Sequence, residues 1–139
     1  MLRTVAPATV EPVTLAEAKA HLRIDDNDSD TLVSACITAA REVVERQTGY
    51  ALAEAGYEWT PEGDRTTPLP VWPGTVTSAD GEYPILFTTT PSAAPAALKA
   101  AILLLIGDLF ANREAGTEKA LTENPAAQNL MFPFRRVMP

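Results

Sequence analysis

The sequence has little of what disulfide bonding or side-chain catalysis requires. Among its 139 residues there is one cysteine, Cys36, and one histidine, His21. A single cysteine excludes an internal disulfide, and the two residues together are too few for a zinc site of Cys and His ligands. Cys36 lies in an alanine-rich stretch with helical character, so we expect it to be a small buried apolar side chain. The lack of disulfides fits assembly in the cytosol.

Motifs that bind phosphate, a metal or a reactive water are also missing. The sequence has no glycine-rich phosphate loop and no supported Ser/His/Asp set. The acidic run at residues 25–30 resembles the start of a calcium loop, but it lacks the required glycine and the closing glutamate. It is better suited to starting a helix, with Asp28 or Ser29 as the cap. We therefore expect no catalytic residue, no cofactor and no metal.

Long hydrophobic runs are missing too. The most hydrophobic stretch, residues 100–107, is far shorter than the roughly 20 residues of a membrane span. Residues 1–5 lack the apolar core of a secretory signal. Aromatic residues make up only 6% of a chain that is 46% hydrophobic, and Ala, Leu, Val and Ile supply most of the apolar content. This composition indicates packed helices and no association with a membrane.

Positive charge is scarce, and the formal net charge is −7. An acidic surface repels phosphate, so tight binding of nucleic acid is not expected, although DNA could slide past such a surface without sticking. Two helices joined by a short loop could form a helix-turn-helix that presents residues 31–41. That segment follows a run of acids, which is the wrong sign for reading DNA. The ordinary explanation of the acidity is solubility.

The pattern along the chain predicts a single domain over residues 1–139 with five segments. Thr14 and Glu17 form a capping box that starts a first helix, and Gly49 ends a second one. Residues 97–111 are apolar nearly all round, which predicts a central helix. Asn124 and Pro125 start a last short helix. The segments are an N-terminal arm at 1–13, helices at 14–54, a β or extended insertion at 55–91, helices at 92–131 and a tail at 132–139.

Charged residues on the second helix are expected to face solvent. Cys36 and Val43 belong to its apolar stripe, whereas Arg41 and Glu45 fall on the other side. Their i,i+4 spacing predicts a surface ion pair that contributes a few tenths of a kcal/mol.

The middle of the chain is rich in proline, with short β-favouring pieces at residues 57–60, 69–72, 75–77 and 83–90. Asp80 and Gly81 form a turn signal that would join the last two pieces into a hairpin. We therefore predict a mainly α fold. It is a small bundle of three main helices plus a short C-terminal helix, with a proline-rich β-hairpin or extended insertion between the second and third long helices.

Aromatic and basic residues on irregular or edge structure are the candidate interface residues, because such side chains anchor protein interfaces. For each one alone, packing on the chain's own helices is an equally good explanation. Together they indicate an arm and a tail that dock on a neighbouring protein. The candidates are Trp59, Trp72, Phe87, Phe132, Phe134 and Arg135.

The order of these structural motifs resembles the phage head–tail connector (adaptor) family. The resemblance begins at residues 13–23, VTLAEAKAHLR, and continues through the acidic loop into residues 30–49. The long apolar segment at 95–114 and the C-terminal residues 130–135 also resemble that family. Leu69-Pro70 is similar to a pair in the middle region of the family. The middle of the chain departs most from the family pattern, because Pro73 interrupts it.

The resemblance implies a structural, non-enzymatic virion component at the head–tail junction of a tailed phage, a prophage or a gene-transfer particle, assembled in the host bacterial cytoplasm. Copies of the chain would form a ring, dodecameric in the particle, between the portal protein and a stopper or tail-completion protein. DNA would pass through the ring only as cargo. The alternative is a small acidic helical module or regulator that binds a soluble protein.

Overall fold

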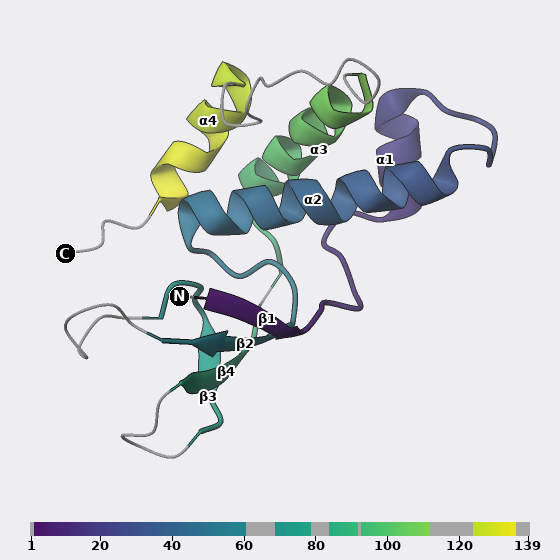
Figure 1. Cartoon of the computed structure of the whole chain (residues 1–139). Helices are drawn as coiled ribbons and strands as arrows, with labels where there is room; N and C mark the ends of the chain where they lie inside the picture. Colours follow the sequence, from purple (N-terminus) through teal and green to yellow (C-terminus); the bar gives the residue numbers. More distant parts are fainter. Residues whose placement is uncertain (1, 61–68, 79–83, 92, 112–123, 136–139) are drawn as a thin grey trace.

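The computed structural model describes residues 2–60, 69–78, 84–91, 93–111 and 124–135. In these residues the chain forms a layer of helices and a sheet, and the sheet lies below α2 in Figure 1. The helices are α1 (Leu15–Leu22), α2 (Asp30–Thr48), α3 (Ala96–Ala111) and α4 (Pro125–Met131), followed by the 3-10 turn η2 (Phe132–Phe134). The strands are β1 (Leu2–Ala6), β2 (Gly56–Trp59), β3 (Gly74–Val76) and β4 (Ile85–Thr89).

The prediction of a mainly α bundle with a β-hairpin inserted between the second and third long helices is wrong. The described strands form one four-stranded antiparallel sheet in the order β1-β2-β4-β3. Its edge strand β1 comes from the segment predicted as an extended arm, so the sheet is no insertion. Arg3 of β1 forms an ion pair with Glu58 of β2, 55 residues further along the chain. A local pattern does not reveal so distant a partner, which is why β1 was missed.

The other strands lie close to the predicted β pieces, with one exception. β4 pairs with β2 on one side and with β3 on the other. The piece at 69–72 is not a strand, and only Trp72 makes an isolated parallel bridge, to Tyr50. The turn predicted at Asp80 and Gly81 lies outside the described residues.

Helix boundaries follow the capping signals in the sequence. The Thr14 side chain accepts a hydrogen bond from the Glu17 backbone N–H, and the Glu17 carboxylate accepts one from the Thr14 N–H, so the capping box is confirmed. Gly49 ends α2 in the left-handed conformation, with φ 71°, and Asn124 caps α4. Ser29 occupies the cap position of α2, but its side chain makes no capping hydrogen bond. None of the described helices is both long and apolar enough to span a membrane.

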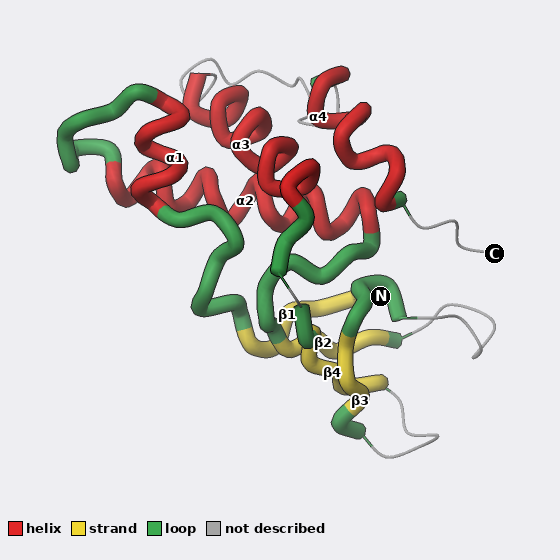
Figure 2. Tube along the Cα trace, turned by 180° about the vertical axis from the view of Figure 1, so that it is seen from behind, coloured by secondary structure: helices red, strands yellow, loops and turns green. Residues whose placement is uncertain are grey.

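The helical core is organised around α3, which was predicted to be central. It contacts α1, α2 and α4, and Figure 2 shows α1, α3 and α4 lying against α2. Cys36 is buried in this core, as predicted. The fully buried side chains of α3 are Leu98, Ala101, Ile102, Leu105 and Ile106.

A second, smaller core covers the side of the sheet that carries its large aromatic residues. Tyr57 stacks on Phe87 with ring centroids 5.4 Å apart, and Trp59 and Val71 are buried beside them. Two alanines from the chain that leaves α2, Ala51 and Ala55, complete the cluster. The aromatic rings thus fix the sheet to the segment that follows α2.

Thr89 joins β4 to that same segment through a buried hydroxyl group. Its Oγ1 accepts a hydrogen bond from the Ala55 N–H at 2.8 Å and donates one to the Ala53 carbonyl at 2.7 Å. The side chain is fully buried, so water cannot replace either partner.

Replacing Thr89 by valine keeps the shape and removes both hydrogen bonds. We expect Thr89→Val to destabilise the fold by about 1–3 kcal/mol, because it leaves the Ala55 N–H buried without an acceptor. Urea denaturation measures the effect. Thr88→Val, on the opposite face of the same strand and less buried, is the matched control. Equal stability of the two variants would contradict this role of Thr89.

Candidate functional site

The expected surface ion pair on α2 is a buried network. Arg41 and Glu45 are each only 3% exposed, so the prediction that they face solvent is wrong. The Nη1 of Arg41 donates to Glu45 Oε1 at 2.5 Å, and its Nε donates to Glu11 Oε2 at 2.8 Å. The helical periodicity of α2 could not reveal this, because the sheet and the segment after β1 cover what would otherwise be its solvent face.

The network connects three parts of the chain. Glu11 lies between β1 and α1, and it also accepts a hydrogen bond from the Thr38 hydroxyl at 3.1 Å. Glu45 accepts one from the Leu52 N–H at 2.9 Å, in the segment that leads to β2. α2 is therefore tied through Arg41 to the chain that precedes it and through Glu45 to the chain that follows it.

The protonation of the network follows from these contacts. Burial by itself lowers the pKa of Arg41, but the hydrogen bonds to Glu11 and the charge of Glu45 outweigh burial and raise the pKa above its ordinary value. Burial, assisted by the negative charge of Glu45, also raises the pKa of the neighbouring Tyr57 hydroxyl. Arg41 therefore stays charged, and Tyr57 stays neutral, at any physiological pH.

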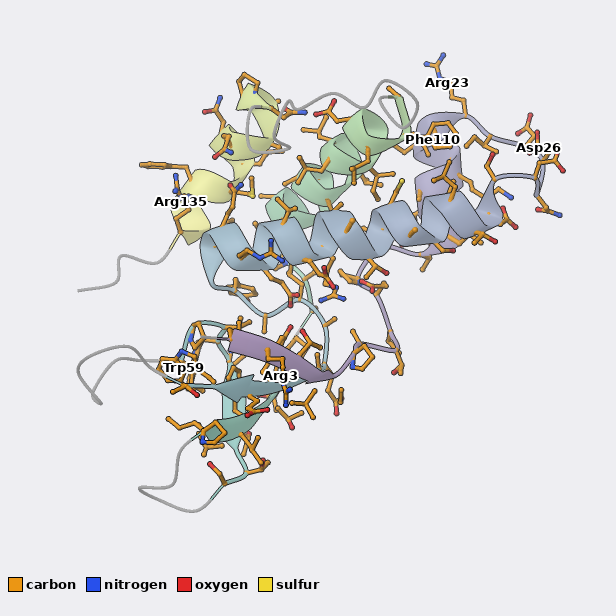
Figure 3. All side chains as sticks on the ribbon, in the orientation of Figure 1. Arg3, Arg23, Asp26, Trp59, Phe110 and Arg135 are labelled. Carbon is orange, nitrogen blue, oxygen red and sulfur yellow. The ribbon has the colours of Figure 1, made fainter. Side chains whose placement is uncertain are left out.

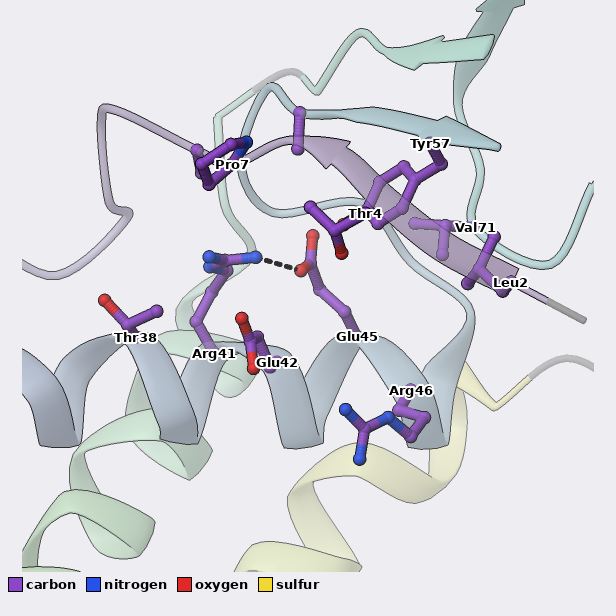
Figure 4. A pocket seen from close by; sticks show the side chains of 12 residues that line it. Leu2, Thr4, Pro7, Thr38, Arg41, Glu42, Glu45, Arg46, Tyr57 and Val71 are labelled. Atoms are coloured by element: carbon purple, nitrogen blue, oxygen red, sulfur yellow. Dashed lines mark hydrogen bonds and ion pairs between the residues drawn. The ribbon is translucent and has the colours of Figure 1, made fainter. Parts of the chain in front are cut away.

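A pocket of about 480 Å³ lies between α2 and the strands β1 and β2 (Figure 4). The two buried charged side chains that line it, Arg41 and Glu45, form an ion pair with each other. The described residues contain no group of three or more His, Cys, Asp or Glu side chains that could hold a metal ion. The pocket is lined by Leu2, Thr4, Pro7, Ala8, Thr38, Arg41, Glu42, Glu45, Arg46, Ala55, Tyr57 and Val71.

A second feature is exposed, at the C-terminal end of α2. Tyr50 packs edge-on against Phe134 with ring centroids 6.1 Å apart, and its backbone forms the bridge to Trp72. Trp72 is 56% exposed and Phe132 is 72% exposed. Arg135, labelled beside η2 in Figure 3, is exposed as well. We call this surface the aromatic corner: Tyr50, Trp72, Phe132, Phe134 and Arg135.

The structure separates the six predicted interface residues into two groups. Trp59 and Phe87 are 8% and 1% exposed, so they pack in the sheet core and offer little surface to a neighbour. The other four belong to the aromatic corner. Phe134 meets the Tyr50 ring, and Trp72 bridges to Tyr50 through its backbone. Phe132 and Arg135 lie beside Phe134 in the chain. Tyr50, which holds this corner together, was not among the predicted interface residues. Its position directly after the helix-ending Gly49 was the available signal, because that position often packs back on the helix.

The buried network provides a direct test of how the layers are joined. We expect Arg41→Met to destabilise the fold by about 3–5 kcal/mol, because it leaves the carboxylates of Glu11 and Glu45 without their cation. Arg46→Met, at an exposed position five residues further along α2, is the matched control and should change stability by less than about 0.5 kcal/mol. Thermal and urea denaturation measure both. Similar losses in the two variants would show that the network does not hold the layers.

Comparison with proteins of known sequence places these features in a family. Residues 12–135 match the family described as phage gp6-like head-tail connector protein. The head completion protein gp6 of Enterobacteria phage HK97 is 49% identical over 41 residues, which is 30% of this chain and 38% of that protein. The aligned part thus spans well under half of the relative.

Solved structures share the fold. A chain in the neck of an empty gene transfer agent (GTA) particle, computed with C6 symmetry, superposes with a TM-score of 0.70 at 22% identity, covering 99% of this chain and 96% of the other. A chain in the virion of a native gene transfer agent particle gives 0.68 at 23% identity with the same coverage. The crystal structure of bacteriophage HK97 gp6 gives 0.50 at 23% identity, covering 88% and 91%.

The family match covers most of the chain, including the capping box, the acidic loop, the apolar α3 and the aromatic end of α4. It confirms the head–tail connector resemblance and does not favour the alternative of an independent protein-binding module. The chain belongs to the phage gp6-like head-tail connector family.

Proposed function

We propose that this chain is the repeating subunit of a ring at the head–tail junction of a phage or a phage-like particle. The ring lies between the portal protein and a stopper or tail-completion protein. The observation that carries the proposal is the family match over residues 12–135. The fold shared with a neck component of a gene transfer agent particle supports it.

The ring follows from how identical subunits assemble. When two different surfaces of one chain contact each other and the rotation closes, the copies form a ring. The related neck structure was computed with C6 symmetry, and a ring of twelve subunits is compatible with a six-fold axis. We propose twelve copies for the assembled particle.

The charge of the chain fits a passage for DNA. With a formal net charge of −7 and a pI of about 4.6, the subunit repels phosphate and releases few counterions on contact with DNA. DNA passes as cargo and is not bound. The role proposed for the chain is structural and involves no catalysis.

The aromatic corner is the surface proposed to contact a neighbouring protein. Large exposed aromatic side chains beside an arginine are the residues that anchor interfaces. Phe132 exposes 72% of its surface directly after α4, and a patch of exposed large apolar side chains marks an interaction site. Trp59 and Phe87 belong to the buried core of the sheet and are not part of this surface.

The mass of the assembly tests the function. Light scattering of the purified chain, alone and with the cognate portal protein, is expected to show a ring-sized mass in at least one sample. A small oligomer of fixed size whose mass does not change when the portal protein is added would contradict the proposed connector function. It would favour a protein-binding module instead.

Single substitutions test the aromatic corner. We expect Trp72→Ala and Phe132→Ala each to weaken assembly at least tenfold, since truncating a central aromatic anchor costs about 2 kcal/mol or more. The concentration at which the ring-sized species is half-formed is the measurement. Val10→Ala removes an equally exposed apolar side chain, 75% exposed, away from the corner, and should assemble like the unmodified chain. If the two aromatic variants assemble like the unmodified chain, the aromatic corner is not part of the interface.

A further inference from the structure

Both edges of the sheet carry backbone that is unpaired among the described strands. β1 and β3 are the outer strands of the order β1-β2-β4-β3. Every residue of β1 is exposed, and Thr75 and Val76 of β3 are exposed too. The outer N–H and C=O groups of an edge strand are a ready template for another strand.

Neither edge carries much protection against such pairing. Natural edge strands are often protected by proline, by charged side chains, especially lysine, or by a β-bulge. Leu2–Ala6 contains neither proline nor lysine, and its one charge, Arg3, is paired with Glu58. Gly74–Val76 contains no charged residue. The irregularity between Thr4 and Ala6 confines pairing to the first part of β1 and does not abolish it.

On one face of the sheet, a row of side chains has no covering neighbour at either edge among the described residues. Directly opposed residues share a face, and the register places Thr4, Tyr57, Phe87 and Val76 in one row across the four strands. Phe87 and Tyr57 in the middle of this row are buried, whereas Val76 at one end is 47% exposed. Leu2, on the same face of β1 as Thr4, is 42% exposed. The row is thus buried in the middle and left open at both ends.

Strand direction decides which second copy fits. All neighbouring strands are antiparallel, so with four strands in the sheet the outer strands β1 and β3 run in opposite directions. A second copy placed beside the first in the same orientation therefore presents β1 antiparallel to the first copy's β3. A ring relates its subunits in this way, by rotation about one axis without inversion.

We propose that β3 of one copy pairs with β1 of the next, so that the sheet is continuous from subunit to subunit around the ring. This inference rests on the proposed ring and names one of the surfaces that close it. Backbone hydrogen bonds supply the ladder, and Val76 of one copy is covered by the β1 side chains of the next. The contact is head-to-tail, and each copy uses both of its edges.

Engineered cysteines test the pairing in the full chain. Thr4→Cys combined with Val76→Cys puts a thiol at each end of the same row. Within one chain the two positions are three strand spacings apart, about 14 Å, which is too far for a disulfide. Between copies, opposed residues have Cβ atoms about 5 Å apart. Leu2→Cys with Val76→Cys covers a register shifted by two residues.

The expected result of mild oxidation in the presence of the portal is a ladder of covalent multimers from one of these double variants. Thr4→Cys with Thr75→Cys is the matched control, because Thr75 lies on the opposite face and should give no ladder. Each single variant should stay monomeric on a non-reducing gel, as should the unmodified chain, whose Cys36 is buried.

The outcomes separate the pairing from the connector function. If either double variant forms ring-sized particles but neither variant cross-links, the proposed edge pairing is wrong and the proposed connector function is unaffected. Covalent dimers from Thr4→Cys alone would show that β1 pairs with β1 of a second copy, which also overturns it. A ladder without any ring-sized mass would keep the pairing and reject the closed ring, and the absence of both would reject both.

Discussion

The arrangement of the helices and the sheet depends on the contacts made by the guanidinium group of Arg41. It lies between two carboxylates, Glu11 from the chain before α2 and Glu45 from α2 itself. Removing these charges from water is costly, and the mutual attraction repays the cost only when geometry and further hydrogen bonds are good. Here Thr38 and the Leu52 N–H satisfy the remaining carboxylate oxygens. The network therefore specifies where the segments on either side of α2 must lie.

From that placement the rest of the surface follows. The segment after Glu45 carries Tyr50, whose ring meets Phe134 and whose backbone meets Trp72. The segment before Glu11 carries β1 and brings it beside β2. The two ion pairs of Arg41 thus hold the segment that leads to the aromatic corner and the segment that leads back to the outer strand β1. The proposed contact surfaces are therefore set by where these segments lie in the fold.

Local signals in the sequence predicted the helices well. Thr14, Gly49 and Asn124 mark helix ends through hydrogen bonds with close neighbours in the chain, and the apolar character of α3 reports its burial on several sides. Distant pairing was not predictable in this way. β1 and its partner are 55 residues apart, and Arg41 looks like a surface residue until the segment that covers it is placed.

In the candidate site, too, local sequence signals predicted less than the distant contacts of the fold determine. Trp59 and Trp72 are both tryptophans in a proline-rich, β-favouring region, and nothing local distinguishes them. The register of β2 against β4 directs Trp59 into the sheet core, whereas the loop that carries Trp72 leaves it exposed. Aromatic composition selected residues of both kinds, and only the tertiary fold decided which of them reach the surface.

The position of β1 at the start of the described chain has a consequence for how the subunit folds. On the ribosome β1 is made before α1 and α2, yet its partner β2 follows only after both helices. Contacts between distant segments form late, because the intervening loop must close first. The helices can therefore collapse on one another while β1 is still unpaired. A nascent chain in that state exposes a strand that another chain could capture, so the subunit is open to premature association until β1 has paired with β2.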